Sequence, residues 1–382
     1  MLEVSVIAYF ADDPSRTYQL TQWLPVLERL HERHPVAVVL RDPASAAVLE
    51  DVTSLAVLTA PGFADLTALY ERLDAKVALY CNNSMINFQS LVDTRMLHAH
   101  INHGESDKQS MASNNAKAYD RVFVAGEAAV QRHAVGLLEF DLDRLVRVGR
   151  PQLDLHREPL LGPSTRRTIL YAPTWEGDAE YNDYTSVDTI GADILRAIAA
   201  APDARLVYKP HPKLATSPTP AVRAAHRELV SMVSEAGRRD PDAGHVSITN
   251  GDILAVMPEC DAIITDVSSV GLDWLYLRTE KPIFLTDRHH DAERLRREVP
   301  VSRCADVIDD VDVTELAARI ANRLDHDEHR LARAAMRHHY FDDLQVGEST
   351  VRFLDAVDDL VRRRDNLLGA DPARHSGTAH TA

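Results

Sequence analysis

Two histidines and a serine-rich turn carry the groups with which this chain could do chemistry. His103 ends an apolar-alternating strand that begins at Leu97, and the neighbouring Gly104 would let a ligand approach the backbone closely. An imidazole titrates near neutral pH, so His103 can take a proton from an attacking hydroxyl. Lys108 would place a positive charge near a phosphate. The alternative is that both are ordinary side chains on a surface loop.

The second histidine, His211, stands between two prolines in the string Lys209-Pro210-His211-Pro212. The prolines fix the backbone on both sides and prevent a helix there. A rigid turn holds an imidazole at a small entropic cost, which suits a group that must meet a leaving phosphate. A purely structural proline turn is the alternative.

The serine-rich turn lies in residues 263–287, which are typical of a buried strand, a turn, a helix and a second buried strand. Asp266, Ser268 and Ser269 fall where the first strand ends and the helix begins. A helix N-terminus offers unpaired N–H groups and a partial positive charge, so an anionic ligand is stabilised there. The alternative is that Asp266 or a serine simply caps the helix.

Three further residues near predicted strand ends could support such a site. Thr174 could donate to a phosphate, and Trp175 could stack on a base or line a cleft. Arg150, together with Arg144 and Arg147, would bring positive charge to the junction between two domains. Trp175 could instead be a packed core residue, and the arginines could instead lie on a solvated edge.

Short apolar strands alternate with amphipathic helices along the whole chain. This alternation indicates βαβ units and mostly parallel sheets, hence an α/β protein. Gly149 and Pro151 punctuate a connection, so we predict an N-terminal Rossmann-like domain over 1–150 and a C-terminal one over 151–368 that includes the final helix. Residues 369–382 are small and polar, and we predict a disordered tail. Polar strings at strand ends in both halves predict a central cleft between the domains.

Composition excludes several classes of protein. The 382 residues carry a net charge of −16, which argues against an extended nucleic-acid footprint and against electrostatic adhesion to anionic lipid. No stretch approaches the roughly 20 apolar residues of a membrane span. The three cysteines are far apart and without metal-ligand spacing, which suits a reduced interior. We therefore expect a cytoplasmic protein, with weak association at the inner face of the cell membrane as the remaining alternative.

Several catalytic motifs are absent from the sequence. It contains no GxxxxGK[ST], no GxGxxG after a strand, no HExxH and no GxSxG. It also has no DxD string at which a sugar transferase could hold a cation. Histidine, lysine and backbone N–H groups would then have to neutralise a leaving diphosphate, and we expect no metal and no cofactor.

Five strings in this order resemble the signature of the CDP-glycerol glycerophosphotransferase family, the teichoic-acid primases and polymerases of bacterial cell envelopes. They are His103-Gly104 with Lys108, residues 171–175, residues 209–212, residues 265–270, and Lys281-Pro282 with Asp287. The resemblance covers about residues 97–360.

The resemblance implies a GT-B-like fold, with the acceptor in the first domain and the donor in the second. The implied reaction moves a glycerol or ribitol phosphate from a CDP-linked donor to a polyol-phosphate or glycan hydroxyl and releases CMP. It serves cell-envelope or capsule polymer synthesis. His103 would be the general base, and His211 would stabilise or protonate the donor diphosphate. Ser268 and Ser269 would bind phosphate, while Asp266 would orient the turn or a donor hydroxyl.

The remaining residues complete this implied site. The donor set also includes Lys108, Thr174 and Lys209, and the supporting set is Gly104, Trp175 and Arg150.

The sequence departs from the usual His-Gly-Thr-Pro-Leu-Lys of the family at Glu105, Ser106 and Asp107. Two carboxylates change the charge beside the expected base, so the acceptor or the donor is expected to differ. Two alternatives stay open: a GT-B glycosyltransferase with another nucleotide-sugar donor, and a non-catalytic nucleotide-binding relative. The sequence leaves open the alditol, the acceptor, processivity and the oligomeric state.

Overall fold

The structure, a computed structural model, describes residues 3–177 and 179–369. These residues divide into two compact units. The first unit contains residues up to 104, 112–155 and those from 341 onward, and the second contains 105–111 and 156–340. Of the predicted tail, Gly369 is the last residue of a helix, and residues 370–382 lie outside the described residues.

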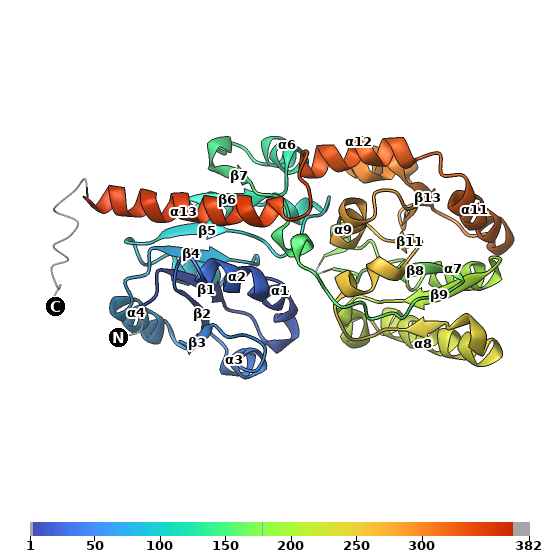
Figure 1. The fold of residues 1–382 in the computed structure, drawn as a ribbon, viewed down its shortest axis with the longest axis horizontal. Helices are drawn as coiled ribbons and strands as arrows, with labels where there is room; N and C mark the ends of the chain where they lie inside the picture. Colours follow the sequence, from blue (N-terminus) through green and yellow to red (C-terminus); the bar gives the residue numbers. More distant parts are fainter. Residues whose placement is uncertain (1–2, 178, 370–382) are drawn as a thin grey trace. The chain divides into compact units, whose positions relative to one another are not determined.

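The first unit is built on a sheet of seven parallel strands in the order β3-β2-β1-β4-β5-β6-β7 (Figure 1). The strands are β1 (Val6–Phe10), β2 (Val36–Leu40), β3 (Ala56–Thr59), β4 (Val77–Tyr80), β5 (Leu97–His100), β6 (Arg121–Val124) and β7 (Leu145–Arg147). The helices are α1 (Tyr18–Thr21), α2 (Leu24–His31), α3 (Pro43–Leu49), α4 (Phe63–Arg72), α5 (Asn87–Ser90), α6 (Glu127–Gly136) and α13 (Glu348–Gly369).

The second unit repeats this plan with six parallel strands in the order β10-β9-β8-β11-β12-β13. The strands are β8 (Arg167–Ala172), β9 (Ala204–Tyr208), β10 (Val246–Ser247), β11 (Ala262–Thr265), β12 (Ile283–Thr286) and β13 (Asp306–Ile308). The helices are α7 (Gly191–Ala200), α8 (Pro220–Arg239), α9 (Ser269–Leu277), α10 (Ala292–Glu298), α11 (Val313–Asp325) and α12 (Arg330–Phe341).

Both sheets reverse their strand order once, between β1 and β4 in the first unit and between β8 and β11 in the second. In open parallel sheets, ligands bind outside the carboxyl ends of the strands at such a reversal. The predicted parallel α/β architecture is confirmed, and it directs attention to the residues that come directly after these four strands.

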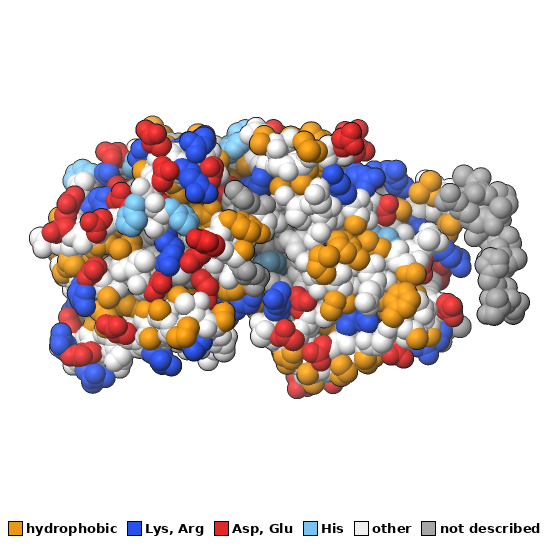
Figure 2. Space-filling model, turned by 180° about the vertical axis from the view of Figure 1, so that it is seen from behind, with side chains coloured by type: hydrophobic (Ala, Val, Ile, Leu, Met, Phe, Trp, Pro, Cys, Tyr) orange, Lys and Arg blue, Asp and Glu red, His pale blue; other side chains and the backbone are white. Residues whose placement is uncertain are grey.

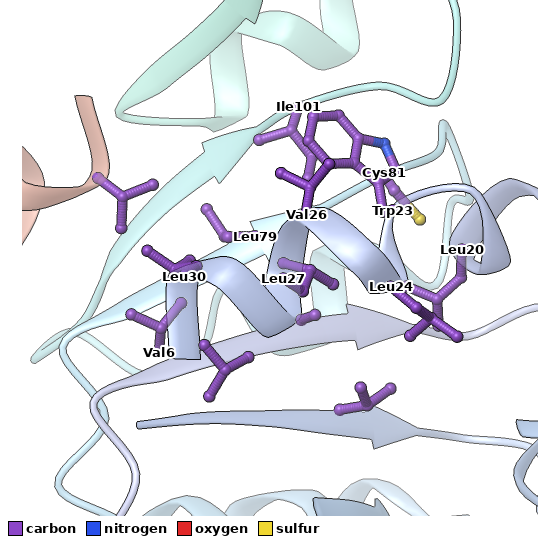
Figure 3. Close-up of a cluster of buried hydrophobic side chains, with 14 of the residues drawn as sticks. Val6, Leu20, Trp23, Leu24, Val26, Leu27, Leu30, Leu79, Cys81 and Ile101 are labelled. Carbon is purple, nitrogen blue, oxygen red and sulfur yellow. The ribbon is translucent and has the colours of Figure 1, made fainter. Parts of the chain in front are cut away.

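Helices cover both faces of the first sheet, which explains why its strands are apolar without alternation. Alternate residues of β1 belong to two separate apolar clusters: Val6 and Phe10 lie in one, and Ile7 and Tyr9 lie in the other. Figure 3 shows the first cluster, in which the apolar side chains of α2 lie against the strands.

The final helix, α13, belongs to the first unit and not to the second domain in which we expected it. Its apolar face supplies Phe353, Val357 and Leu360 to the same cluster as α2. The ring of Phe353 lies 5.1 Å from that of Trp23. The expected boundary near 150 falls close to the observed one at 155. The chain returns to the first unit at residue 341, and the apolar face of α13 packs in its core.

The surface carries both signs of charge. Figure 2 shows Lys and Arg interspersed with Asp and Glu over the face of each unit that it presents. Among the described residues, no helix is long and apolar enough to cross a membrane.

The N-terminus of α13 is capped from a distance by Asp154, the last residue of the turn Pro151–Asp154. The carboxylate of Asp154 accepts from Gly347 N at 2.7 Å, from Thr350 N at 2.6 Å and from Thr350 Oγ1 at 2.8 Å. A carboxylate there satisfies N–H groups that have no partner within the helix.

We predict that Asp154→Ala lowers the stability of the protein by roughly 2 kcal/mol, because two N–H groups at the start of the helix lose their acceptor. The midpoint of urea unfolding measures this loss. Asp359→Ala is the control, since Asp359 is 72% exposed on α13 and pairs with the equally exposed Arg362. Equal midpoints for the two variants would show that the cap is unimportant.

Candidate functional site

Three of the strings singled out in the sequence meet at one edge of the second sheet. Strands β8 and β9 continue to pair beyond their ends, because Lys209 N donates to Tyr171 O at 2.9 Å and His211 N donates to Pro173 O at 3.1 Å. This pairing holds His211 beside the segment that contains Thr174.

Asp266 comes directly after β11 and links the segments at this edge through hydrogen bonds. Its Oδ2 accepts from Thr174 N at 2.7 Å and from Ser186 N at 3.3 Å, and its Oδ1 accepts from Thr286 Oγ1 at 2.6 Å. The side chain is fully buried, and burial raises the pKa of Asp266 to about 6, although these hydrogen bonds oppose the rise. Both carboxylate oxygens of Asp266 therefore bond to other segments of the second unit, and its two expected roles, orienting the turn or a donor hydroxyl, stay predictions.

The N-terminus of α9 comes after this turn and is not capped by its own serine. Ser268 occupies the N-cap position, but its side chain makes no capping hydrogen bond. Its Oγ is buried and has no hydrogen-bond partner in the described part of the chain. The plain-cap alternative for Ser268 and Asp266 is thus wrong. An unpartnered buried hydroxyl beside helical N–H groups is an arrangement that an anion would complete.

His211 lies in a group with Trp175 and Lys213. The Trp175 and His211 rings stack with centroids 6.0 Å apart, and Lys213 Nζ lies 3.7 Å from the centroid of the Trp175 ring. His211 Nδ1 also accepts from Lys213 N at 3.2 Å, which fixes the orientation of the imidazole. We did not single out Lys213 from the sequence, although it directly follows the Lys-Pro-His-Pro string.

Thr174 and Lys209 of the expected donor set are also buried, with each only 4% exposed. Burial lowers the pKa of Lys209, and the charge of Asp252 partly opposes this. Their backbone groups shape the edge of the sheet, whereas Ser268, Ser269 and His211 are partly exposed.

Lys108 belongs to the second unit, because the short segment 105–111 takes its position there. Lys108 Nζ lies 5.8 Å from the centroid of the Tyr184 ring. Asp107 accepts a hydrogen bond from Tyr340 Oη, which in turn accepts from Val301 N at 3.2 Å. Glu105 and Ser106 are buried. The three residues that depart from the family pattern are therefore held within the second unit.

His103 belongs to the first unit, and its position is set through the backbone. Asn102, at a φ of 51°, precedes it, and its carbonyl accepts from Trp23 Nε1 at 2.6 Å. His103 O accepts from the buried Arg150 Nη1 at 2.7 Å. Arg150 thus supports the histidine instead of lying on a solvated edge. Trp23 was not found from the sequence, where it reads as one more apolar residue next to α2.

The expected site residues are divided between the units. The first unit holds His103, Gly104 and Arg150, and the second holds Lys108, Thr174, Trp175, Lys209, His211, Asp266, Ser268 and Ser269. Within residues 3–177 and 179–369, no group of three or more His, Cys, Asp or Glu side chains could hold a metal ion. The expectation of a metal-independent reaction stays a prediction.

Most of the chain matches one family of known proteins. Residues 96–358 match the family model described as CDP-Glycerol:Poly(glycerophosphate) glycerophosphotransferase. No curated protein matches the chain.

Among solved structures, a variant of the wall teichoic acid polymerase TagF is similar with a TM-score of 0.63 and 14% identity, over 96% of this chain and 90% of that one. A TagF variant soaked with CDPG gives a TM-score of 0.59 and 12% identity, over 94% and 89%. A glycosyltransferase from Rickettsia africae gives 0.56 and 10%, over 95% and 100%. These likenesses show the fold, which is GT-B-like as expected.

The raised pKa of Asp266 predicts a pH-dependent stability. The folded protein holds this proton up to about pH 6, whereas an ordinary aspartate loses it near 3.8. The contribution of Asp266 to stability is therefore full below about pH 4 and lost as the pH rises through about 6. About two pH units correspond to about 3 kcal/mol.

Asp266→Asn keeps an acceptor oxygen and removes the titration. We expect its stability relative to the wild type to improve by up to about 3 kcal/mol between about pH 4 and pH 7, as measured by urea unfolding. Asp309→Asn, at an exposed position, is the control. Parallel pH profiles for wild type and Asp266→Asn would contradict the assignment.

Proposed function

Because the chain belongs to the CDP-glycerol:poly(glycerophosphate) glycerophosphotransferase family, we propose that this transferase moves an alditol phosphate from a CDP-linked donor to an acceptor hydroxyl. The observation that carries the proposal is the buried, unpartnered Oγ of Ser268 at the N-terminus of α9. It lies on the sheet edge that also carries His211 and Lys213. A helix N-terminus, a hydroxyl and two basic side chains suit a diphosphate.

In this reaction the acceptor oxygen attacks the phosphorus that carries the alditol. A new P–O bond forms, the bond from that phosphorus to the bridging oxygen breaks, and CMP leaves with the bridging oxygen. The acceptor proton passes to His103, which is partly exposed and has a fixed backbone. The product is a phosphodiester at the end of a cell-envelope or capsule polymer.

On the donor side, Ser268, Ser269 and the N–H groups of α9 receive phosphate oxygens. Lys213 and His211 neutralise the charge that develops on the departing CMP. Trp175 serves as the platform for these two residues, since its ring contacts both. Lys108 adds a further cation from the segment that comes after the proposed base.

The donor is proposed to be CDP-glycerol or CDP-ribitol, and the TagF variant soaked with CDPG supports a CDP-linked donor. Fixed positive groups take the place that a metal ion holds in other transferases. The expected cytoplasmic location, with weak association at the inner membrane face as the alternative, stays a prediction.

We predict that the purified protein releases CMP from CDP-glycerol in the presence of an acceptor. His103→Ala should lower kcat at least about 100-fold, because a general base contributes roughly 10²–10⁴-fold. His211→Ala should do the same by removing a group that stabilises the leaving phosphate. His156→Ala is the matched control, since this histidine is 86% exposed. Full CMP release by either site variant would remove that residue from the mechanism.

The nucleotide can be identified without turnover. A ligand that binds only the folded protein raises its melting temperature, so CMP, CDP, UMP and UDP can be compared by thermal shift. We expect the cytidine nucleotides to give the larger shifts. A larger shift with UDP would favour a glycosyltransferase that uses a UDP-linked sugar.

Ser268→Ala should weaken binding of CDP-glycerol roughly tenfold, because a hydrogen bond to a charged phosphate contributes about 1.5–3 kcal/mol. Isothermal titration calorimetry measures the change. Ser302→Ala is the matched control: its hydroxyl is also buried without a partner among the described residues, but it lies in the turn Pro300–Cys304. An equal effect of both substitutions would locate the phosphate elsewhere.

A further inference from the structure

A second group of polar side chains lies next to the turn that follows β12, the neighbour of β11 in the second sheet. This turn carries His289, whose ring lies edge-on to that of Tyr184 with centroids 5.6 Å apart. Lys108 Nζ lies over the same Tyr184 ring, 5.8 Å from its centroid. Three separate segments of the second unit therefore bring a phenol, an imidazole and an ammonium group together.

Hydrogen bonds and an ion pair fix the segments that carry Tyr184 and His289. The buried Asp287 accepts from His289 N at 3.1 Å, which holds the turn after β12. The next residue, Arg288, donates to Asp188 at 2.6 Å and so ties this turn to the segment of Tyr184. The two side chains are therefore held in place before any ligand binds.

The phenol of Tyr184 is buried but makes no use of its hydroxyl group within the protein. The side chain is 8% exposed, and within residues 3–177 and 179–369 its Oη makes no hydrogen bond. Burial raises the pKa of Tyr184, so the phenol keeps its proton and can donate it in a hydrogen bond. Because buried tyrosine hydroxyls normally have a partner, this one points to a ligand with an acceptor oxygen.

Three carboxylates act electrostatically on Tyr184, and each of them accepts a hydrogen bond from another group. Asp107 is bonded to a side chain of α12, and Glu298 accepts from Arg294 at 2.9 Å. Asp287 accepts from backbone N–H groups of its own turn. Ammonium, imidazole and phenol groups can all donate hydrogen bonds, so the group suits an anion such as a phosphate.

Asp266 connects this group to the proposed phosphate site at α9. Its carboxylate accepts from Ser186 N at 3.3 Å, two residues after Tyr184. It also accepts from Thr286 Oγ1 at 2.6 Å, three residues before His289. The residue that fixes the start of α9 thus fixes the segments of Tyr184 and His289 as well.

The order of the strands places two different groups on the two sides of the α9 N-terminus. His211 follows β9 and His289 follows β12, while α9 begins after β11, which lies between β8 and β12. A diphosphate at the α9 N-terminus therefore has His211 and Lys213 on one side and Tyr184 and His289 on the other. Since His211 and Lys213 are proposed to neutralise the departing CMP, the other phosphate falls to the second group.

We propose that Tyr184 and His289, beside Lys108, bind the phosphate that carries the alditol, which is the phosphate that is transferred. Tyr184 Oη and the His289 imidazole donate to its non-bridging oxygens, while the CMP phosphate lies on the side of His211. The donor is thereby bound in one direction along the sheet edge. This assignment rests on the proposed function and adds two residues for the group that moves.

The test compares CMP with CDP-glycerol on the full-length protein in the absence of an acceptor. Isothermal titration calorimetry gives the Kd of each compound. We expect Tyr184→Phe and His289→Ala each to weaken binding of CDP-glycerol roughly tenfold and to leave binding of CMP unchanged. Tyr184→Phe keeps the ring that contacts His289, so the fold is kept. The matched controls are Tyr181→Phe, 55% exposed in the same segment, and His326→Ala, at an exposed position of the second unit.

Unchanged binding of CDP-glycerol in Tyr184→Phe would overturn the assignment. An equal loss for CMP and CDP-glycerol would also overturn it, because a purely structural disturbance of the sheet edge weakens both. By contrast, His211→Ala should weaken binding of both compounds, since it removes a group on the CMP side. If the wild type binds neither compound, the proposed donor is wrong, and UMP and UDP then test the site in the same way through the dependence of their second phosphate on Tyr184.

Discussion

The sheet edge of the second unit, where the proposed donor groups lie, depends on one buried carboxylate. A charge inside a protein is unfavourable unless hydrogen bonds surround it, and Asp266 receives three from Thr174, Ser186 and Thr286. The groups that donate these hydrogen bonds come from three separate segments. Bonding to the Asp266 carboxylate therefore fixes all three segments at once. The start of α9 and the segment of Trp175 keep their places at the sheet edge for this reason. Burial still raises the pKa of Asp266, although these hydrogen bonds oppose the rise.

The first unit fixes its candidate base in a different way. Trp23 and Arg150 donate hydrogen bonds to the backbone carbonyl groups of Asn102 and His103. Trp23 belongs to the core beneath the site, so the apolar packing around α2 sets the position of the histidine. Both units therefore place reactive side chains by binding the backbone around them, which makes each position depend on a whole core.

Much of the fold was predictable because strand and helix patterns are local. The parallel sheets, and the polar strings at the ends of β5, β8, β9 and β11, can be inferred from periodicity and composition. Contacts between distant residues leave no such trace. The cap that Asp154 provides for α13 spans 196 residues to Thr350. Likewise, Asp266 is of a residue type that often caps helices. Only its burial in the structure shows that it links separate segments of the second unit.

The segment between Gly104 and Ala112 holds the residues that depart from the family pattern. Asp107 is bonded to Tyr340, and Glu105 is buried, so both carboxylates are part of the second unit. His103 and Lys108 are five residues apart in sequence, yet each takes its position from a different core. A substitution at 105–107 would thus alter contacts within the second unit.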